Sequence, residues 1–130
     1  GFLRLVTAEG HLLTPKDSLE AAGIRDGDHL TAIYRKALVS STARAFALCC
    51  SGDDQIVTWG DGGYGGDSSQ VQDLLRSAQQ MQSSDRAFAA ILGDGSVVTW
   101  GDEGRGGNSS AVDLRGVQQI QATNIAFAAI

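Results

Sequence analysis

One short phrase occurs twice in the chain and constrains its fold more than any other feature. The phrase Ile-Val-Thr-Trp-Gly-Asp at residues 56–61 returns as Val-Val-Thr-Trp-Gly-Asp at residues 97–102. Its two tryptophans, Trp59 and Trp100, are 41 positions apart. A period of roughly 40 residues is typical of propellers, solenoids and other arrays, in which each unit needs a neighbour to cover its apolar face. We therefore expect tandem units that stack on one another.

The similarity extends to both sides of this phrase. Upstream, Arg-Ala-Phe-Ala occurs at residues 44–47 and 86–89, and Ala-Phe-Ala occurs a third time at 126–128. Downstream, Gly-Gly-Asp-Ser-Ser at 65–69 returns as Gly-Gly-Asn-Ser-Ser at 106–110. We expect the recurring aromatic and glycine positions to be structural residues of the repeat: Phe46, Trp59, Gly60, Phe88, Trp100, Gly101 and Phe127.

The repeated segment is predicted to be mainly β. In its second copy, the apolar stretch 87–92 and the stretch 97–100 flank Gly-Asp-Gly-Ser, and Asp-Gly between alternating apolar residues is typical of a hairpin with a primed turn. The Gly-rich loops that follow each Trp-Gly pair are expected on the surface. We place the repeats at about 43–84 and 85–123, with the start of a third at 124–130.

The N-terminal segment, residues 1–36, has a different pattern. Strands are predicted at 2–6, 11–13 and 29–34, with a short helical turn at 17–23 that begins with capping residues and ends at glycine. Residues 37–42 carry no charge and are expected to be a linker to the repeats, with the lead into the first repeat strand as the alternative.

Charge and composition exclude several classes of function. Residues 37–130 carry five arginines against ten carboxylates, so the net charge of −5 lies in the repeats. Such a surface repels phosphate, and we expect no direct contact with nucleic acid. No apolar run is long enough to span a membrane, and no signal peptide is visible. The chain begins with Gly1 and is interpreted as an internal piece of a longer protein, which we expect to be intracellular and cytoplasmic.

The cysteines and histidines indicate neither a metal site nor catalysis. Cys49 and Cys50 are adjacent, and neighbours in a strand point to opposite faces, so we expect two reduced thiols rather than a disulfide. His11 and His29 are far from them in sequence, and no zinc-ligand spacing is present. The Gly-rich stretch 62–67 resembles a calcium-binding nonapeptide but lacks its apolar position. No cofactor, metal or catalytic residue is predicted.

The repeated phrase resembles the repeats of the regulator-of-chromosome-condensation family. In that family an aliphatic strand, a Gly-Asp-Gly turn and a strand ending in Trp-Gly precede a Gly-rich loop, and seven four-stranded blades close a propeller. The resemblance covers residues 43–130 and implies a partial β-propeller. The family's Gly-Gln-Leu-Gly after Trp-Gly is replaced here by Gly-Gly-Asp-Ser at 65–68 and Gly-Gly-Asn-Ser at 106–109. The sequence of these repeats is also similar to that of large HECT-ligase-like repeat proteins.

The N-terminal segment resembles the C-terminal half of a ubiquitin-like β-grasp domain. The likeness rests on the order of strand, Gly turn, Leu-Leu, Ser-Leu-Glu, Gly-Ile, Asp-Gly-Asp and final strand. It implies core positions at Leu5, Leu13, Leu19, Ile24 and Leu30. Ubiquitin binds partners through an apolar patch on this sheet, and Val6 and Ile33 are candidates for that role; alternatively they are ordinary sheet residues.

Tyr64 and Arg105 occupy equivalent positions in the two Gly-rich loops. Tyrosine and arginine are enriched in binding hot spots, so both are candidate contacts to a protein partner, with an idle surface loop as the alternative.

These observations together predict a protein–protein interaction module or scaffold within a larger ubiquitin-ligase-like repeat protein, with no enzymatic activity of its own. Two alternatives stay open. The segment is a substrate-recognition arm of an active HECT-type ubiquitin ligase, or it belongs to a guanine-nucleotide exchange factor for a small GTPase. A partner of unknown identity is expected, and no membrane.

Overall fold

The computed structural model describes residues 2–7, 10–14, 23–35, 37–50 and 55–130, with only the backbone of 2–4 and 31–35. These residues are mainly β and form small antiparallel sheets, none of which closes on itself. The chain divides into two compact units, Gly1–Lys36 and Ala37–Ile130, and each is described by itself. No helix long and apolar enough to cross a membrane is found in the described part of the chain.

The first unit is built on one two-stranded sheet. β1 (Phe2–Val6) pairs antiparallel with β2 (Thr31–Arg35), with Val6 opposite Thr31. The return strand expected at 11–13 is reduced to a single bridge between Val6 and Leu12. The core expected from the ubiquitin-like resemblance is incomplete: the Leu30 side chain is 38% exposed, and Leu19 lies outside the described residues.

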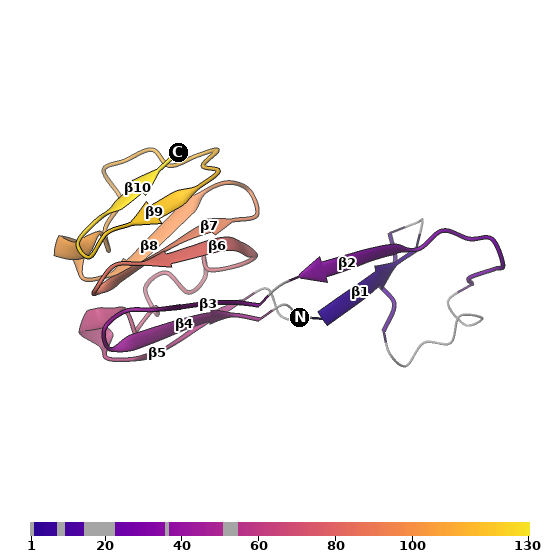
Figure 1. Ribbon diagram of the computed structural model, residues 1–130, viewed down its shortest axis with the longest axis horizontal. Helices are drawn as coiled ribbons and strands as arrows, with labels where there is room; N and C mark the ends of the chain where they lie inside the picture. Colours follow the sequence, from indigo (N-terminus) through magenta and orange to yellow (C-terminus); the bar gives the residue numbers. More distant parts are fainter. Residues whose placement is uncertain (1, 8–9, 15–22, 36, 51–54) are drawn as a thin grey trace. The chain divides into compact units, whose positions relative to one another are not determined.

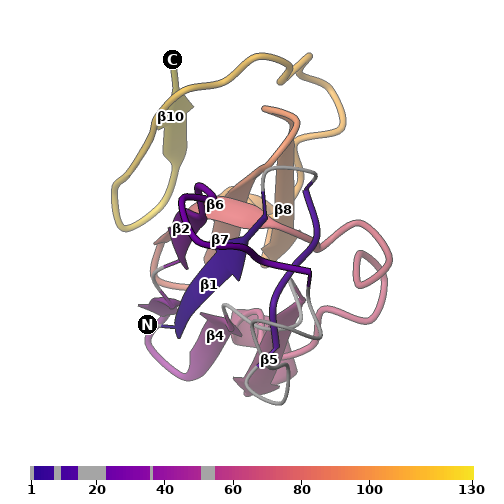
Figure 2. The same cartoon turned by 90° about the vertical axis from the view of Figure 1, so that its right-hand side faces the viewer.

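The second unit contains three sheets that follow one another along the chain (Figure 1). Its strands are β3 (Leu38–Ser41), β4 (Ala45–Cys49), β5 (Ile56–Gly60), β6 (Ala78–Ser83), β7 (Ala87–Leu92), β8 (Val97–Gly101), β9 (Ile120–Ala122) and β10 (Phe127–Ala129). The sheets have the strand orders β3-β4-β5, β6-β7-β8 and β9-β10. Two views at right angles place β6-β7-β8 between the other two sheets (Figures 1 and 2).

Residues 37–42, which the sequence predicts to be a linker, are instead mostly strand. β3 pairs with β4 and completes a three-stranded sheet equivalent to β6-β7-β8. The prediction was wrong because an uncharged stretch of six residues with two aliphatic side chains reads equally as linker or edge strand. Only its pairing with β4, across the turn near Thr42, decides between the two.

The two three-stranded sheets have the same register at their aromatic residues. Phe46 lies opposite Trp59 across β4 and β5, and Phe88 lies opposite Trp100 across β7 and β8. Because side chains alternate between the faces of a strand, each Phe–Trp pair shares one face and the flanking alanines share the other. The rings stack in both pairs, with centroids 5.6 Å apart in the first and 5.2 Å in the second.

The core lies between successive sheets. Phe88 and Trp100 on the middle sheet pack against Ala45, Ala47 and Ile56 of the first sheet. The small alanine side chains allow the two sheets to approach closely, and Ala45 and Ala47 are fully buried. The opposite face of the middle sheet packs on Ile120 of the third sheet in the same manner.

Candidate interaction surface

The Gly-rich turns that follow each Trp-Gly pair are held by the same hydrogen bonds in both copies. After β5 a single turn of 3₁₀ helix, η1 (Gly62–Tyr64), is capped by Asp61, whose side chain accepts from Gly63 N at 2.9 Å. The equivalent turn after β8 is η2 (Glu103–Arg105), which Asp102 caps. Both loops are therefore formed in advance of any partner.

A hydroxyl ties each turn to the loop between the first two strands of its own sheet. Thr42 Oγ1 donates to the Tyr64 carbonyl at 2.8 Å, and Ser84 Oγ donates to the Arg105 carbonyl at 2.8 Å. The same hydroxyls accept from the backbone N–H of Ala45 and Ala87 at 3.0 Å. Small hydroxylated residues suit this position because they bond to nearby backbone without filling the space around it.

The glycine of each Trp-Gly pair is required because the backbone of a neighbouring strand passes close to it. Gly60 has φ of 112°, and a Cβ placed there would lie 2.5 Å from the Arg44 carbonyl oxygen. Gly101 has φ of 105° and would meet the Arg86 carbonyl oxygen at the same distance. Any other residue would be strained in both its backbone and its side chain.

Tyr64, one of the candidate contacts, lies between two guanidinium groups. Its ring is 5.0 Å from Arg44 Cζ and 4.8 Å from Arg86 Cζ, and the residue is half-buried. Arg44 and Arg86 also approach Asp61 and Asp102, with N–O distances of 3.9 and 3.7 Å. Because Arg44 lies just before β4 of the first sheet and Arg86 just before β7 of the second, Tyr64 joins the two repeats, and this contact uses much of its surface within the chain.

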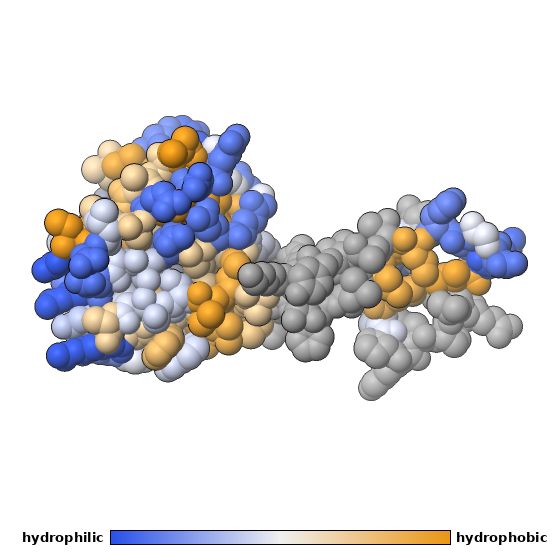
Figure 3. Space-filling model, viewed as in Figure 1, coloured by the Kyte–Doolittle hydropathy of each residue, from blue (hydrophilic) through white to orange (hydrophobic). Residues whose placement is uncertain are grey.

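Arg105, the other candidate contact, differs from Tyr64 although the two positions are equivalent. It is half-buried, and no ion pair or ring contact is found for its guanidinium among the described residues. Hydrophilic side chains gather at the end of the unit that carries these turns (Figure 3). Arg105 is thus the more available of the two side chains for a partner.

Val6 and Ile33 lie on the paired strands of the first unit. Val6 is half-buried and bridges to Leu12, so only part of its side chain is accessible. Ile33 is opposite Arg4 in the ladder, and its side chain lies outside the described residues.

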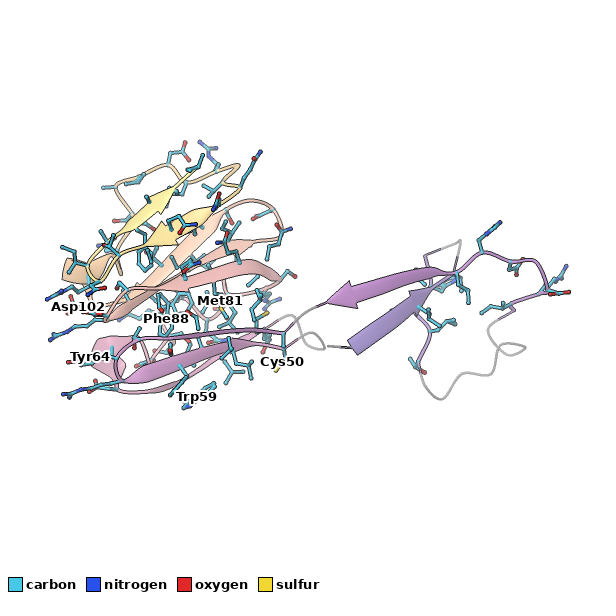
Figure 4. The ribbon with its side chains drawn as sticks, in the orientation of Figure 1. Cys50, Trp59, Tyr64, Met81, Phe88 and Asp102 are labelled. Carbon is cyan, nitrogen blue, oxygen red and sulfur yellow. The ribbon has the colours of Figure 1, made fainter. Side chains whose placement is uncertain are left out.

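Among the structural residues of the repeat, Trp100 and Trp59 have opposite environments. Trp100 is 4% exposed, and its Nε1 donates to the Gly65 carbonyl at 3.1 Å. Trp59 is 46% exposed and points away from the sheets, whereas Phe88 points between them (Figure 4). Phe127 repeats the contact of Phe88, because a Cβ on Gly106 would lie 2.6 Å from its ring just as one on Gly65 would lie 2.7 Å from Phe88.

A groove that the sequence did not predict runs between the first Gly-rich segment and β8. It encloses about 630 Å³, with residues 67–71 and Leu74 on one side and residues 97–101 with 107–110 on the other. The only sequence signal for it is the stretch 70–76, which is two residues longer than its counterpart in the second repeat.

The remaining candidate chemistry concerns metal ligands, cysteines and titratable carboxyls. Among the residues that the structure describes, no three side chains of the metal-binding types are grouped; Cys49 is buried in β4 and Cys50 is exposed. The pKa shifts involve exposed carboxyls: the backbone N–H of Ser69, followed by its hydroxyl, lowers the pKa of Asp67. Arg115 lowers the pKa of Asp113 through a side-chain hydrogen bond. These shifts follow from loop geometry and do not create a general acid or base.

No model of a known protein family matches the chain, and no curated protein matches it either.

Proposed function

We propose that residues 37–130 are divergent repeats of the regulator-of-chromosome-condensation type, part of a β-propeller that serves as a protein–protein interaction scaffold. The main support is that the contact between the first and second sheets recurs between the second and third. Phe88 and Trp100 cover the turn at Gly65, and Phe127 covers the turn at Gly106.

A second set of contacts repeats along the chain in support of this proposal. The backbone N–H of Ala43 donates to the Asp85 carbonyl at 3.0 Å, and the backbone N–H of Asp85 donates to the Asn124 carbonyl at 3.0 Å. Each link joins the beginning of one repeat to the beginning of the next. Such nearest-neighbour linkage is how repeat proteins distribute their stability.

The first sheet has an apolar face that matches the buried face of the second. Its side chains Val39, Phe46, Val57 and Trp59 are each between 46% and 68% exposed. Exposed contiguous apolar area of this kind marks an interface. In the proposed propeller, the Gly-rich turn of a further repeat covers Trp59 in the way that the Gly65 turn covers Trp100.

The first unit fits a ubiquitin-like segment, and the combination suggests a larger ubiquitin-ligase-like protein. β1 and β2 pair antiparallel across a long connection, and a turn closed by Asp28 N and the Arg25 carbonyl at 3.1 Å precedes β2. The activity that we propose for the chain itself is binding without catalysis.

The test of this function is reconstitution with purified proteins. Proteins labelled in proximity to the chain in cells would be purified and titrated against it by calorimetry. We expect at least one to bind with a dissociation constant of about 10 μM or tighter, as transient scaffold contacts do. If every purified candidate fails to bind, the proposal is wrong. The chain should also form no reducible adduct with ubiquitin in the presence of activating and conjugating enzymes, and should not accelerate nucleotide release from small GTPases.

A further inference from the structure

The groove between the first Gly-rich segment and β8 combines an apolar floor with a polar rim. Leu74 is 58% exposed on one wall, although Leu75 next to it is fully buried. Val71 and Val98 are half-buried at the margin of the main core and also line the groove. An aliphatic side chain placed between these residues would bury the exposed part of Leu74 and lose contact with water itself.

The charges that line the groove have one sign. Asp67 and Glu103 are both exposed and lie on its walls, and no Lys, Arg or His is among the described residues that line it. The hydrogen bond from Ser69 N to Asp67 Oδ1, at 2.9 Å, favours the ionised carboxylate. A cationic ligand therefore complements the rim.

An open backbone position at Val97 indicates that the ligand is a peptide. In the first repeat the equivalent residue, Ile56, is bonded on its outer edge: its N–H donates to the Leu75 carbonyl at 3.3 Å, and its carbonyl accepts from Gln72 Nε2 at 2.9 Å. At Val97 no described residue makes either bond.

The ladder explains why these groups point outward. The hydrogen bond from Leu92 N to the Ser96 carbonyl sets the alternation between β7 and β8, so that Val97, which is opposite Ile91, directs its N–H and C=O away from β7. The shorter loop of the second repeat does not reach them: Asp113, near the point where Gln72 would be, bonds to Arg115 instead. An extended main chain can supply the donor and acceptor that the first repeat provides from its own loop.

We propose that this groove docks a short, extended segment of a partner protein in which an aliphatic side chain is flanked by lysine or arginine. The inference rests on the proposed binding function and names the surface and the partner chemistry for it. The aliphatic side chain lies against Leu74 and Val98, the cationic groups lie near Asp67 and Glu103, and one peptide unit bonds to the backbone of Val97.

The experiment selects peptides on the whole chain and then tests where they bind. A phage-displayed library of random peptides of about twelve residues, a length that spans such a groove when extended, is panned against the protein, and the enriched peptides are synthesised. We expect them to carry an aliphatic residue between basic ones. Their affinity should fall as salt is raised from about 0.05 to about 0.5 M, because the rim charges are exposed.

Surface variants locate the site without disturbing the core. Leu74→Lys should weaken binding by about tenfold or more, and Glu103→Lys by several-fold. The matched controls are Val112→Lys, which makes the same change at a residue 60% exposed on the second loop, and Asp85→Lys at another exposed carboxylate. Both controls should bind within about twofold of the original chain.

Amide exchange tests the backbone contact. The Val97 amide proton should exchange more slowly in the peptide complex. Two sets of peptides, N-methylated at the odd or at the even backbone positions, test the peptide side, and only the set that leaves free the N–H groups facing Val97 should bind. If peptides are selected but Leu74→Lys binds them unchanged, the groove is the wrong site while the binding function stands. If no peptide is enriched, the groove inference is wrong, and the proposed function is decided separately by the purified-protein titrations.

Discussion

Truncation of the two tryptophans provides a sharp test of the stacked-sheet arrangement, because the same substitution is made twice in one repeated sequence. Trp100 is 4% exposed and Trp59 is 46% exposed. A buried aromatic side chain removes about 150–250 Å² from water, which at about 25 cal/mol/Å² corresponds to about 4–6 kcal/mol. Since measured Trp→Ala losses are about 3–5 kcal/mol, we expect Trp100→Ala to lower the free energy of unfolding by that amount.

The same reasoning gives a smaller cost at Trp59. About half of its surface stays in water, so Trp59→Ala should cost about 2 kcal/mol or less. The two tryptophans have the same ring partner type and nearly the same stacking distance, 5.6 and 5.2 Å, so the difference between the variants isolates the contact with the neighbouring sheet. Unfolding by urea, followed by far-UV circular dichroism because both changes alter the fluorescence, measures the difference.

A third variant separates packing from hydrogen bonding. Trp100→Phe keeps an aromatic ring but removes the N–H that donates to the Gly65 carbonyl, which lies in a buried residue. An unsatisfied buried carbonyl costs about 1–3 kcal/mol, so Trp100→Phe should fall between the original chain and Trp100→Ala. Equal losses for Trp59→Ala and Trp100→Ala, or a loss below about 1 kcal/mol for Trp100→Ala, would refute the stacking of the second sheet on the first.

Three further predictions follow from the same contacts. Gly65→Ala should destabilise the chain by about 2–4 kcal/mol, because φ is positive and the new methyl group would meet the Phe88 ring at 2.7 Å. The control Gly93→Ala, where no atom would lie nearer than 3.5 Å, should cost about 1 kcal/mol or less in the same urea titration. Tyr64→Leu should cost about 1–2 kcal/mol through the loss of two cation–π contacts while Tyr64→Phe retains most of the stability; equal losses would show that the phenol matters instead. Two groups of Ser96, first the hydroxyl and then the backbone N–H, lower the pKa of Asp94 below the ordinary 3.8. The ionised Asp94 therefore stabilises the fold above pH 3.8, and this stabilisation is lost as the pH falls through the lower pKa of the folded state. Ser96→Ala should raise the Asp94 pKa in a carboxyl NMR titration, and an unchanged pKa would contradict the assignment.

The strands with strong local signals were predictable from the sequence, whereas β3 was not. The hairpin of β7 and β8 appears as two apolar runs around Gly-Asp-Gly-Ser, but the type of its turn differs from the prediction. Gly93 and Asp94 are the central residues of the turn and neither has a positive φ, whereas both primed types need one at the first central position. Gly95, the next residue, has φ of 81°. The bonds from Gly95 N to the Leu92 carbonyl and from Leu92 N to the Ser96 carbonyl fit a turn followed by a glycine bulge, which the same dipeptide also accommodates.

Burial could not be predicted at equivalent positions, because it depends on what each sheet stacks against. Trp59 and Trp100 have nearly identical flanking sequences, yet only Trp100 faces another described sheet. The role of Tyr64 was equally hidden, since its two guanidinium partners are separated by 42 positions of sequence and meet only when the repeats stack. The groove at Leu74 is lined by residues of both repeats, and a single repeat would not reveal it.

The stacking contact between sheets is also directional, and this property limits the arrangements in which further sheets can be added to the second unit. The middle sheet presents its Phe88–Trp100 face to the preceding sheet and turn and its alanine face to the following sheet, so it uses different surfaces on its two sides. A contact of this head-to-tail kind either closes into a ring or continues as an open array. In both cases the Gly-rich turns lie at one end of the stack, because Asp61 and Asp102 cap them identically at the end of equivalent strands. The side chains on these turns and in the grooves between sheets can then vary without loss of the stacking glycines, as the exchange of Tyr64 for Arg105 illustrates. Sequence divergence at those positions is therefore compatible with the fold, and it is where specificity for a partner can be encoded.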